Sequence, residues 1–334
     1  MRNIPLLLKN ICKFADCKYN NKLKNMNTTP KVSVIVPNYN HQAFLKERID
    51  TILQQTYQDF ELIILDDSST DDSVSIIEKY RSNEHVTHIV LNDQNTGSTF
   101  KQWDKGVSLA RGEYIWIAES DDAAHPEFLS TLVGQLESHP KAVLAYAHSL
   151  WVNEKGQVVN DKRHKINDGA VKVYDGLKFA HWAMLPCNNI YNASMVVFKR
   201  TVYDKVDKNF LQLQLFGDWK FWMGVCLQGG DIIEVRQYLN YFRRHNNKVT
   251  FKCAREGKDW PELMSVLRSF ISQLGLKGIR LRIFRGRWTR DFNRSHVPNK
   301  EVFAEQNKDI IKASKFDTYL YKVMQVLFNI YWYG

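Results

Sequence analysis

The sequence has no long apolar run and few cysteines. Apolar residues make up 44% of its 334 residues, yet no uninterrupted stretch approaches the ~18 residues that a membrane-spanning helix needs. The apolar segment at 4–8 is shorter than the ~7–15 residues of a signal-peptide core, so we expect a cytoplasmic protein. The five cysteines are odd in number and scattered, without a CxxC pair. This usage argues against a disulfide framework and against a zinc site.

Positive charge is in excess and unevenly placed. The 46 Lys and Arg residues outnumber the 36 Asp and Glu residues, giving a net charge of +10. A basic balance favours an anionic partner, which is a nucleic acid, a nucleotide or an anionic membrane face. The excess concentrates in residues 1–31 and 277–290. A solvated surface explains such runs as well as a binding role does, and both readings stay open here.

Residues 32–118 alternate between short apolar runs and amphipathic segments. The pattern predicts four strands separated by helices, with the strands at 32–36, 60–65, 86–91 and 114–118. Such alternation indicates an α/β fold with a Rossmann-like, mainly parallel sheet, helices on both faces and right-handed crossovers. Ligands of these sheets gather at the carboxyl ends of the strands.

Beyond residue 122 the pattern is looser. We expect helices at 126–136 and 216–227 and short strands at 143–146, 195–198, 232–235 and 238–242. The segment from about 251 to the end reads as helical, with a broad apolar face in its last helix. The predicted organisation is therefore a basic N-terminal extension at 1–30, a domain at 31–250 with halves at 31–122 and 123–250, and a C-terminal helical region at 251–334.

Carboxylates follow two of the predicted strands. Asp66 and Asp67 end the second strand, and Glu119-Ser120-Asp121-Asp122 follows the fourth. Acids this dense repel one another unless a cation neutralises them, and hard divalent ions prefer oxygen ligands. For residues 69–72 the simpler interpretation is helix capping, because acids are favoured at a helix N-terminus.

An ordered set of motifs completes this pattern. They read VSVIVPNYN at 32–40, LQQTY at 53–57, FELIILDDSSTD at 60–71, NTG at 95–97, ARGEYI at 110–115, ESDD at 119–122, GDWKFW at 217–222 and YFRRH at 241–245. Each motif is weak alone, but the set resembles family 2 glycosyltransferases of the GT-A fold. The resemblance covers about residues 31–250 and implies an inverting, metal-dependent transfer of sugar from a nucleotide donor.

The resemblance implies a nucleotide site. Tyr39 would stack on the nucleobase and Asp67 would bond its ring N–H. Further nucleotide contacts fall to Pro37, Asn40, Gly97, Glu119, Arg243 and Arg244. Glu119 stands where the family usually has aspartate, so its carboxylate reaches one methylene further.

The resemblance also implies a metal site and a catalytic base. Mn²⁺ or Mg²⁺ would be held by Asp121, Asp122 and His245, and Asp218 would remove the proton of the acceptor hydroxyl. Considered without the surrounding motif, Asp218 is more simply interpreted as the cap of the following helix. Gly217 stands where the family often has glutamate. A weaker assignment places Asn188, Asn189 and Trp219 against the acceptor or the sugar.

The implied partners are a nucleotide-sugar donor, with UDP as the expected nucleotide, and a glycan or lipid-linked glycan acceptor from surface-polysaccharide synthesis. Nucleic acid is not among them, and the sequence leaves the oligomeric state open. The last helix, the basic segments and the aromatics at 331–333 suggest a peripheral contact with the inner face of the cytoplasmic membrane. A last helix packed on its own domain is the simpler interpretation, and both stay open here.

Three other functions compete with this reading. A nucleotidyltransferase shares the sheet and the metal carboxylates, but it usually has a Gly-rich phosphate loop after the first strand, where this chain has PNYN. A phospho-accepting signalling domain would carry its acid pair after the first strand. A non-catalytic relative that only binds a nucleotide-sugar is the third alternative.

Overall fold

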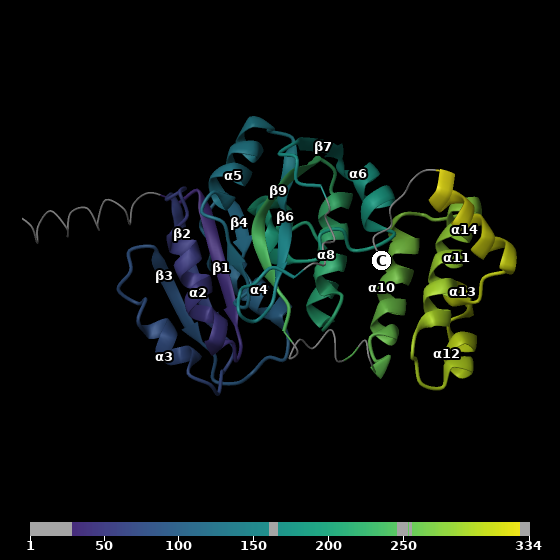
Figure 1. The fold of residues 1–334 in the computed structure, drawn as a ribbon, viewed down its shortest axis with the longest axis horizontal. Helices are drawn as coiled ribbons and strands as arrows, with labels where there is room; N and C mark the ends of the chain where they lie inside the picture. Colours follow the sequence, from purple (N-terminus) through teal and green to yellow (C-terminus); the bar gives the residue numbers. More distant parts are fainter. Residues whose placement is uncertain (1–28, 160–165, 246–252, 254–255, 328–334) are drawn as a thin grey trace, which may run out of the picture.

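The computed structural model describes residues 29–159, 166–245, 253 and 256–327. Most of the basic N-terminal extension and the aromatics at 331–333 lie outside these residues. The described chain forms one nine-stranded sheet flanked by helices, followed by a group of helices at the right of Figure 1.

The first half of the sheet is parallel and matches the predicted β-α alternation. Its strands run in the order β3-β2-β1-β4. Their bounds are β1 Val32–Asn38, β2 Phe60–Asp66, β3 Val86–Leu91 and β4 Tyr114–Ile117. The connecting helices are α2 Gln42–Leu53, α3 Ser73–Glu78 and α4 Thr99–Leu109.

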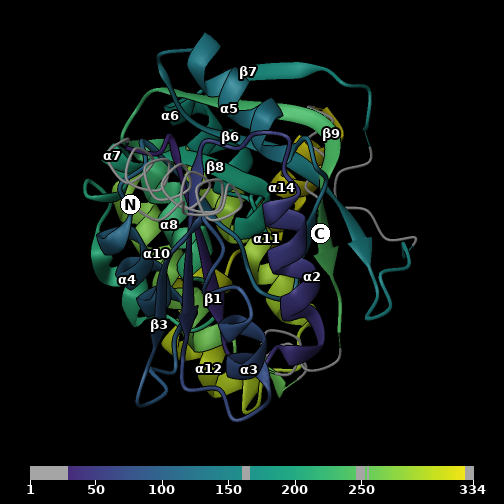
Figure 2. The same cartoon turned by 90° about the vertical axis from the view of Figure 1, so that its left-hand side faces the viewer.

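Alternate side chains of these strands enter two separate cores. Val34 of β1 shares a core with Leu45 and Ile49 of α2, whereas Ile35 shares the other core with Phe100 and Trp103 of α4. Because successive strand residues point to opposite faces, helices are required on both, and Figure 2 shows α2 and α4 on opposite sides of β1. The predicted two-faced architecture is confirmed.

The second half of the sheet is mixed. The order continues β8-β6-β9-β5, and β7 pairs with β9. The bounds are β5 Ala123–Ala124, β6 Ala142–Val152, β7 Val171–Asp175, β8 Val196–Lys199 and β9 Asp231–Arg243. The two strands predicted at 232–235 and 238–242 are one strand, whose pairing with β6 shifts register between them. Strands β5 and β7 were not predicted.

Helices and single turns connect these strands. They are α5 Phe128–Ser138, α6 Gly176–Phe179, η1 Ala180–Met184, η2 Ala193–Met195, α7 Arg200–Tyr203, η3 Lys208–Gln212 and α8 Gly217–Leu227.

The Arg111-Gly112 turn closes the end of the sheet opposite the carboxyl ends. The Glu61 carboxylate accepts hydrogen bonds from Arg111 Nε at 2.9 Å and from Ser33 Oγ at 2.7 Å, while Gly112 N–H donates to Ser33 Oγ at 2.8 Å. A Cβ atom at 112 would lie 2.6 Å from the Ser33 nitrogen. Only glycine fits there, so this motif serves the fold.

The C-terminal segment is helical, as predicted, and shares a core with the sheet domain. Its helices are α10 Trp260–Gln273, α11 Gly278–Arg294, α12 Lys300–Gln306, α13 Lys308–Ile311 and α14 Lys315–Leu327. Trp219 of α8 packs edge-on against Phe270 of α10, with ring centroids 5.2 Å apart, and 6.0 Å from Trp288 of α11. Within the described residues, no helix has both the length and the apolarity to cross a membrane.

Candidate active site

Asp67, directly after β2, holds the loop between β3 and α4. Its carboxylate accepts hydrogen bonds from Asn92 Nδ2 at 2.7 Å, from Thr96 Oγ1 at 2.8 Å and from Gln102 Nε2 at 2.9 Å, and it also accepts from the Thr96 backbone N–H. The side chain is buried. Charge-assisted bonds of this kind are the strong ones, so Asp67 fixes the loop that carries Gly97. Its predicted contact with the nucleobase stays a prediction.

The turn after β1 lies beside this loop and presents an exposed aromatic ring. Tyr39 is 45% exposed. Asn40 has a positive φ of 53°, a conformation that asparagine tolerates, and its Oδ1 accepts the Thr70 N–H at 2.7 Å. Pro37 pairs with Leu65 inside the sheet. Tyr39 is therefore the residue that presents an exposed aromatic ring in this turn.

The acidic run after β4 is anchored at both ends. Glu119 Oε1 accepts Trp103 Nε1–H at 2.9 Å, and Glu119 N–H donates to Ser194 Oγ at 3.0 Å. The Asp122 carboxylate accepts Asn192 Nδ2–H at 2.7 Å and the Arg243 backbone N–H at 2.9 Å. Asp122 is therefore committed to protein donors, although we predicted it as a metal ligand, and that role stays a prediction.

Asp121 lies close to the imidazoles of His41 and His245. His245 Nε2 is 3.1 Å from Asp121 Oδ2, and one ligand atom from each of His41, Asp121 and His245 lies within 4.8 Å of the other two. His41 also contacts Ser120 Oγ through Nδ1 at 2.8 Å. We predicted two of these three residues. His41 was missed, although its position just after β1 placed it at the same sheet edge.

Arg243 contacts the backbone of the acidic run and of the segment that follows β6. Its Nε donates to the Asp121 carbonyl at 2.8 Å, another guanidinium nitrogen donates to the Asn153 carbonyl at 3.0 Å, and a third contacts Glu47. Arg244 lies with its guanidinium carbon 4.6 Å from the Trp151 ring centroid. These contacts give Arg243 a supporting role, and the predicted nucleotide contacts of both arginines stay predictions.

Asp218 lies in the first turn of helix α8 and is half-buried. Its carboxylate accepts Asn188 Nδ2–H at 2.8 Å and the Trp219 N–H at 2.7 Å. Asn188 therefore orients the carboxylate of the predicted base. Asn189, next to it, lines a separate cavity. Trp219 is buried and donates its indole N–H to the Met184 carbonyl, so its predicted acceptor contact has no exposed surface to support it.

Gly217 has a steric cause. A Cβ atom at 217 would lie 2.4 Å from ring carbon Cε2 of Phe100. Phe100 is itself buried and packs edge-on against Trp103 with ring centroids 5.1 Å apart. The position therefore has no room for the glutamate that the resemblance leads one to expect.

Two segments tie the carboxylates to one another. In α4, Gln102 donates to Asp67 and the adjacent Trp103 donates to Glu119. In residues 188–194, side chains at 188, 192 and 194 bond Asp218, Asp122 and the Glu119 backbone in turn. Such a segment spans at most ~20 Å when fully extended. Asp67, Glu119, Asp122 and Asp218 therefore share one hydrogen-bonded frame built by α4 and residues 188–194.

Arg48 is a further charged residue that sequence reasoning missed. It is fully buried in α2 with its guanidinium carbon 5.0 Å from the Trp116 ring centroid. Among the described residues, none accepts a hydrogen bond from its three side-chain nitrogens. Burial lowers the pKa of Arg48 to about 10, while the nearby charges of Asp122 and Asp121 oppose that shift, so the side chain remains cationic at neutral pH. The clue was an arginine on the apolar stripe of α2.

Comparisons with known proteins identify the family and the fold of this chain. The profile of the family described as Glycosyl transferase family 2 matches residues 33–207, just over half of the chain. Glycosyltransferase GlyG of Streptococcus pneumoniae is 39% identical over 106 residues, which are 32% of this chain and 35% of GlyG. The chain thus matches about a third of the length of that relative.

Solved structures show the same fold at low identity. TarS of Staphylococcus aureus, residues 1–349 in complex with UDP-GlcNAc, gives a TM-score of 0.61 at 20% identity and covers 90% of this chain and 80% of that one. Mannosyltransferase PcManGT of Pyrobaculum calidifontis, in complex with GDP-Man and Mn²⁺, gives 0.50 at 14% identity over 93% of this chain and 80% of that one. The GT-A fold expected from the sequence is confirmed.

Proposed function

The chain belongs to glycosyl transferase family 2, and we propose that it moves a sugar from a UDP-linked donor to a glycan or lipid-linked glycan, with inversion at the anomeric carbon. The observation that carries this proposal is the shared frame that joins Asp67, Glu119 and Asp218. UDP as the nucleotide is supported by TarS, a structural relative that binds UDP-GlcNAc. Surface-polysaccharide assembly is the setting that we expect from the family.

The donor set at the carboxyl edge fits a divalent metal ion. Two imidazoles and one carboxylate converge, from His41, His245 and Asp121. Mg²⁺ prefers oxygen ligands alone, whereas transition metals accept imidazole, so this mixed set favours Mn²⁺ over Mg²⁺. PcManGT binds Mn²⁺ with its donor. When bound, the ion would offset the negative charge that develops on the departing diphosphate.

Asp218 supplies the base in this proposal. An inverting transfer is one in-line displacement in which the acceptor oxygen bonds the anomeric carbon as the bond to the diphosphate oxygen breaks. The acceptor proton passes to an Asp218 oxygen, and the nucleoside diphosphate leaves with the electron pair. Asn188 donates a hydrogen bond to Oδ2 of this carboxylate, which keeps the base in one orientation.

Tyr39 is the residue best placed to receive the nucleobase. Its ring is 45% exposed beside the loop that Asp67 organises. A base stacked on this ring would lie at the carboxyl ends of β1 and β2, where sheets of this kind bind nucleotides.

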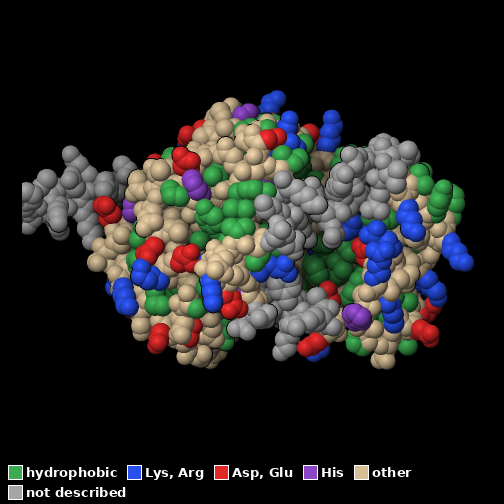
Figure 3. Space-filling view, in the orientation of Figure 1, with side chains coloured by type: hydrophobic (Ala, Val, Ile, Leu, Met, Phe, Trp, Pro, Cys, Tyr) green, Lys and Arg blue, Asp and Glu red, His purple; other side chains and the backbone are tan. Residues whose placement is uncertain are grey.

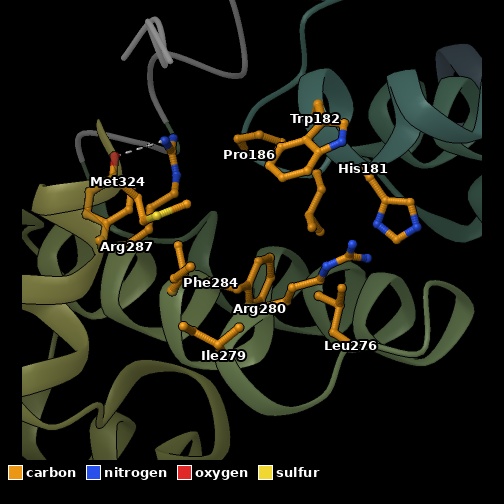
Figure 4. A pocket seen from close by; sticks show the side chains of 12 residues that line it. His181, Trp182, Pro186, Leu276, Ile279, Arg280, Phe284, Arg287 and Met324 are labelled. Carbon is orange, nitrogen blue, oxygen red and sulfur yellow. Dashed lines mark hydrogen bonds between the residues drawn. The ribbon is translucent and has the colours of Figure 1, made fainter. Parts of the chain in front are cut away.

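An apolar groove supports a lipid-linked acceptor. It has a volume of about 220 Å³ and lies between the η1 segment and helices α11 and α14 (Figure 4). Its lining includes Leu276, Ile279, Arg280, Phe284, Arg287 and Met324. Exposed Lys and Arg side chains gather over the neighbouring C-terminal helices (Figure 3). An apolar groove beside cationic side chains suits a chain with an acidic head group, and it supports the proposed peripheral contact with an anionic membrane face.

Thermal unfolding with nucleotides tests the donor assignment. UDP should raise the melting temperature more with Mn²⁺ than without, because ligands that bind only the folded state stabilise it by RT ln(1 + [L]/Kd). UDP should also stabilise more than ATP does. A preference for ATP would contradict the proposal and favour a nucleotidyltransferase.

Asp218→Asn tests the base. The variant should lose sugar transfer and keep UDP binding, because the amide cannot take the proton. Asp204→Asn, at an exposed acid in the same half of the chain, is the matched control and should retain transfer. Equal activity of the Asp218 variant and the control would remove Asp218 from the mechanism.

A further inference from the structure

A second cavity, of about 300 Å³, opens beside the segment that carries Asn188 and Asn189. Strands β6, β7 and β9 contribute its polar end, and α6 with η1 contributes an aromatic wall. The nucleotide and metal groups described above are not among its lining residues. Its size is at the lower limit of ordinary small-ligand sites.

Glu234 of β9 anchors the polar end. Its carboxylate contacts His148 Nε2 at 2.9 Å and accepts the Tyr174 hydroxyl proton at 2.7 Å, with Arg236 Nε at 3.4 Å. Burial raises the pKa of Glu234, but the hydrogen bonds from His148 and Tyr174 outweigh it and bring the pKa down to about 2. The cavity therefore has a rigid end in which Tyr174 and Arg236 present polar groups.

Trp182 of η1 gives the cavity an open aromatic wall. It is 55% exposed, whereas Phe179 and Tyr146, which also line the cavity, are buried. An exposed indole is uncommon, since large apolar side chains are usually covered. The same indole also lines the apolar groove (Figure 4), so the two cavities share this residue.

Two neighbouring asparagines connect the cavity to the base. Asn188 donates to the Asp218 carboxylate, and Asn189, whose Cα atom is one peptide unit away, lines the cavity. A ligand in the cavity would thus contact the residue next to the one that orients the base.

The charges at the cavity favour a neutral ligand. The lining acid is Glu234 and the lining cations are Arg236 and Lys178, while Asp168, outside the lining, pairs with Arg236. Arg236 contacts both acids, at 3.4 Å and 3.8 Å, which leaves no surplus of positive charge for a phosphate. A neutral pyranose matches an apolar ring face that lies beside fixed hydrogen-bonding groups. Its C–H face can pack on the aromatic ring while its hydroxyls bond the polar side chains.

We propose that this cavity binds one neutral pyranose ring of the acceptor glycan, with the ring on the Trp182 indole and its hydroxyls toward Arg236, Tyr174 and Asn189. The inference rests on the proposed function and adds a place for the acceptor to it. Because Asn189 is the chain neighbour of Asn188, which bonds the Asp218 carboxylate, we assign the sugar in this cavity to the part of the acceptor near the attacking hydroxyl.

Saturation-transfer NMR on the full chain with UDP and Mn²⁺ tests this inference. The probes are methyl β-glucoside, methyl β-galactoside and methyl N-acetyl-β-glucosaminide. At least one probe should receive saturation. Trp182→Ala should weaken that transfer by about tenfold, as expected for the loss of an aromatic contact, and Trp182→Phe should restore part of it. The matched control is Tyr319→Ala, which removes a 64% exposed aromatic ring from helix α14.

A parallel melting experiment separates the two proposals. UDP should raise the melting temperature of the wild type and of Trp182→Ala alike. If UDP stabilises the protein while no glycoside receives saturation, or while Trp182→Ala and Tyr319→Ala behave alike, the acceptor cavity is refuted and the donor assignment stands. If UDP does not stabilise the wild type, the proposed function itself fails.

Discussion

Gly217 offers the sharpest test of the packing behind the base. Replacing it with alanine places a methyl group 2.4 Å from Cε2 of Phe100, and two further ring carbons lie within 2.7 Å. Phe100 has little freedom to move, because it packs edge-on against Trp103 and Phe210. Overpacking of a close-packed core costs about 1–3 kcal/mol, so Gly217→Ala should lower the free energy of unfolding by that amount.

Urea denaturation measures this loss as a lower midpoint at an unchanged m-value. Phe100→Leu alone should also destabilise, by roughly 1–3 kcal/mol, because it deletes buried ring atoms. In the double variant the smaller side chain leaves room for the new methyl group. The combined loss should therefore be smaller than the sum of the single losses by about 0.5–3 kcal/mol.

Gly134→Ala is the matched control. A Cβ atom at 134, in helix α5, would meet nothing within 4 Å, so alanine there should stabilise the protein by about 0.5–1 kcal/mol through helix propensity. The steric explanation of Gly217 is refuted if Gly217→Ala stabilises as Gly134→Ala does, or if its effect and that of Phe100→Leu simply add.

Three further changes have defined outcomes. The pKa of Glu234 is lowered from the ordinary glutamate value of 4.5 to about 2 in the folded chain, so its contribution to stability, about 3 kcal/mol, is present above pH 4.5 and lost as the pH falls toward 2. Urea midpoints between pH 6 and 3 should fall less in Glu234→Gln than in the wild type, and parallel curves would contradict this. Arg48→Met should tighten Mn²⁺ binding by about threefold, because a buried positive charge beside the acidic run disfavours a cation, and His245→Ala should weaken it by about tenfold. Titration calorimetry with UDP present measures both, and an unchanged affinity in either variant would remove that residue from the site.

Hydrophobic periodicity was enough to predict the parallel half of the sheet. The runs at 32–36 and 60–65 are fully buried strands, and such runs bounded by polar turns have few other stable structures. The acids at 66–67 and 119–122 were placed at one edge for the same reason, because parallel strands end together. Strand β7 was missed because it is short and mostly exposed, so it lacks the buried apolar run that marks the other strands. It lies at the margin of the sheet, where β9 is its only partner among the described strands.

Long-range contacts of single side chains were beyond sequence reasoning. Asp122 and Asp121 are adjacent and chemically alike, yet one is bonded by Asn192 and the Arg243 backbone while the other lies beside His41 and His245. That division depends on which way each side chain points after the fold forms, and no local pattern encodes it.

The sequence by itself determined the α/β alternation, the family and the sheet edge where the acids gather, because those features follow from residue type and spacing along the chain. The tertiary structure alone decided which carboxylate faces the imidazoles, why residue 217 must be glycine, and that Arg48 carries a buried charge. Each of these depends on atoms far apart in the chain that meet only when the helices pack on the sheet.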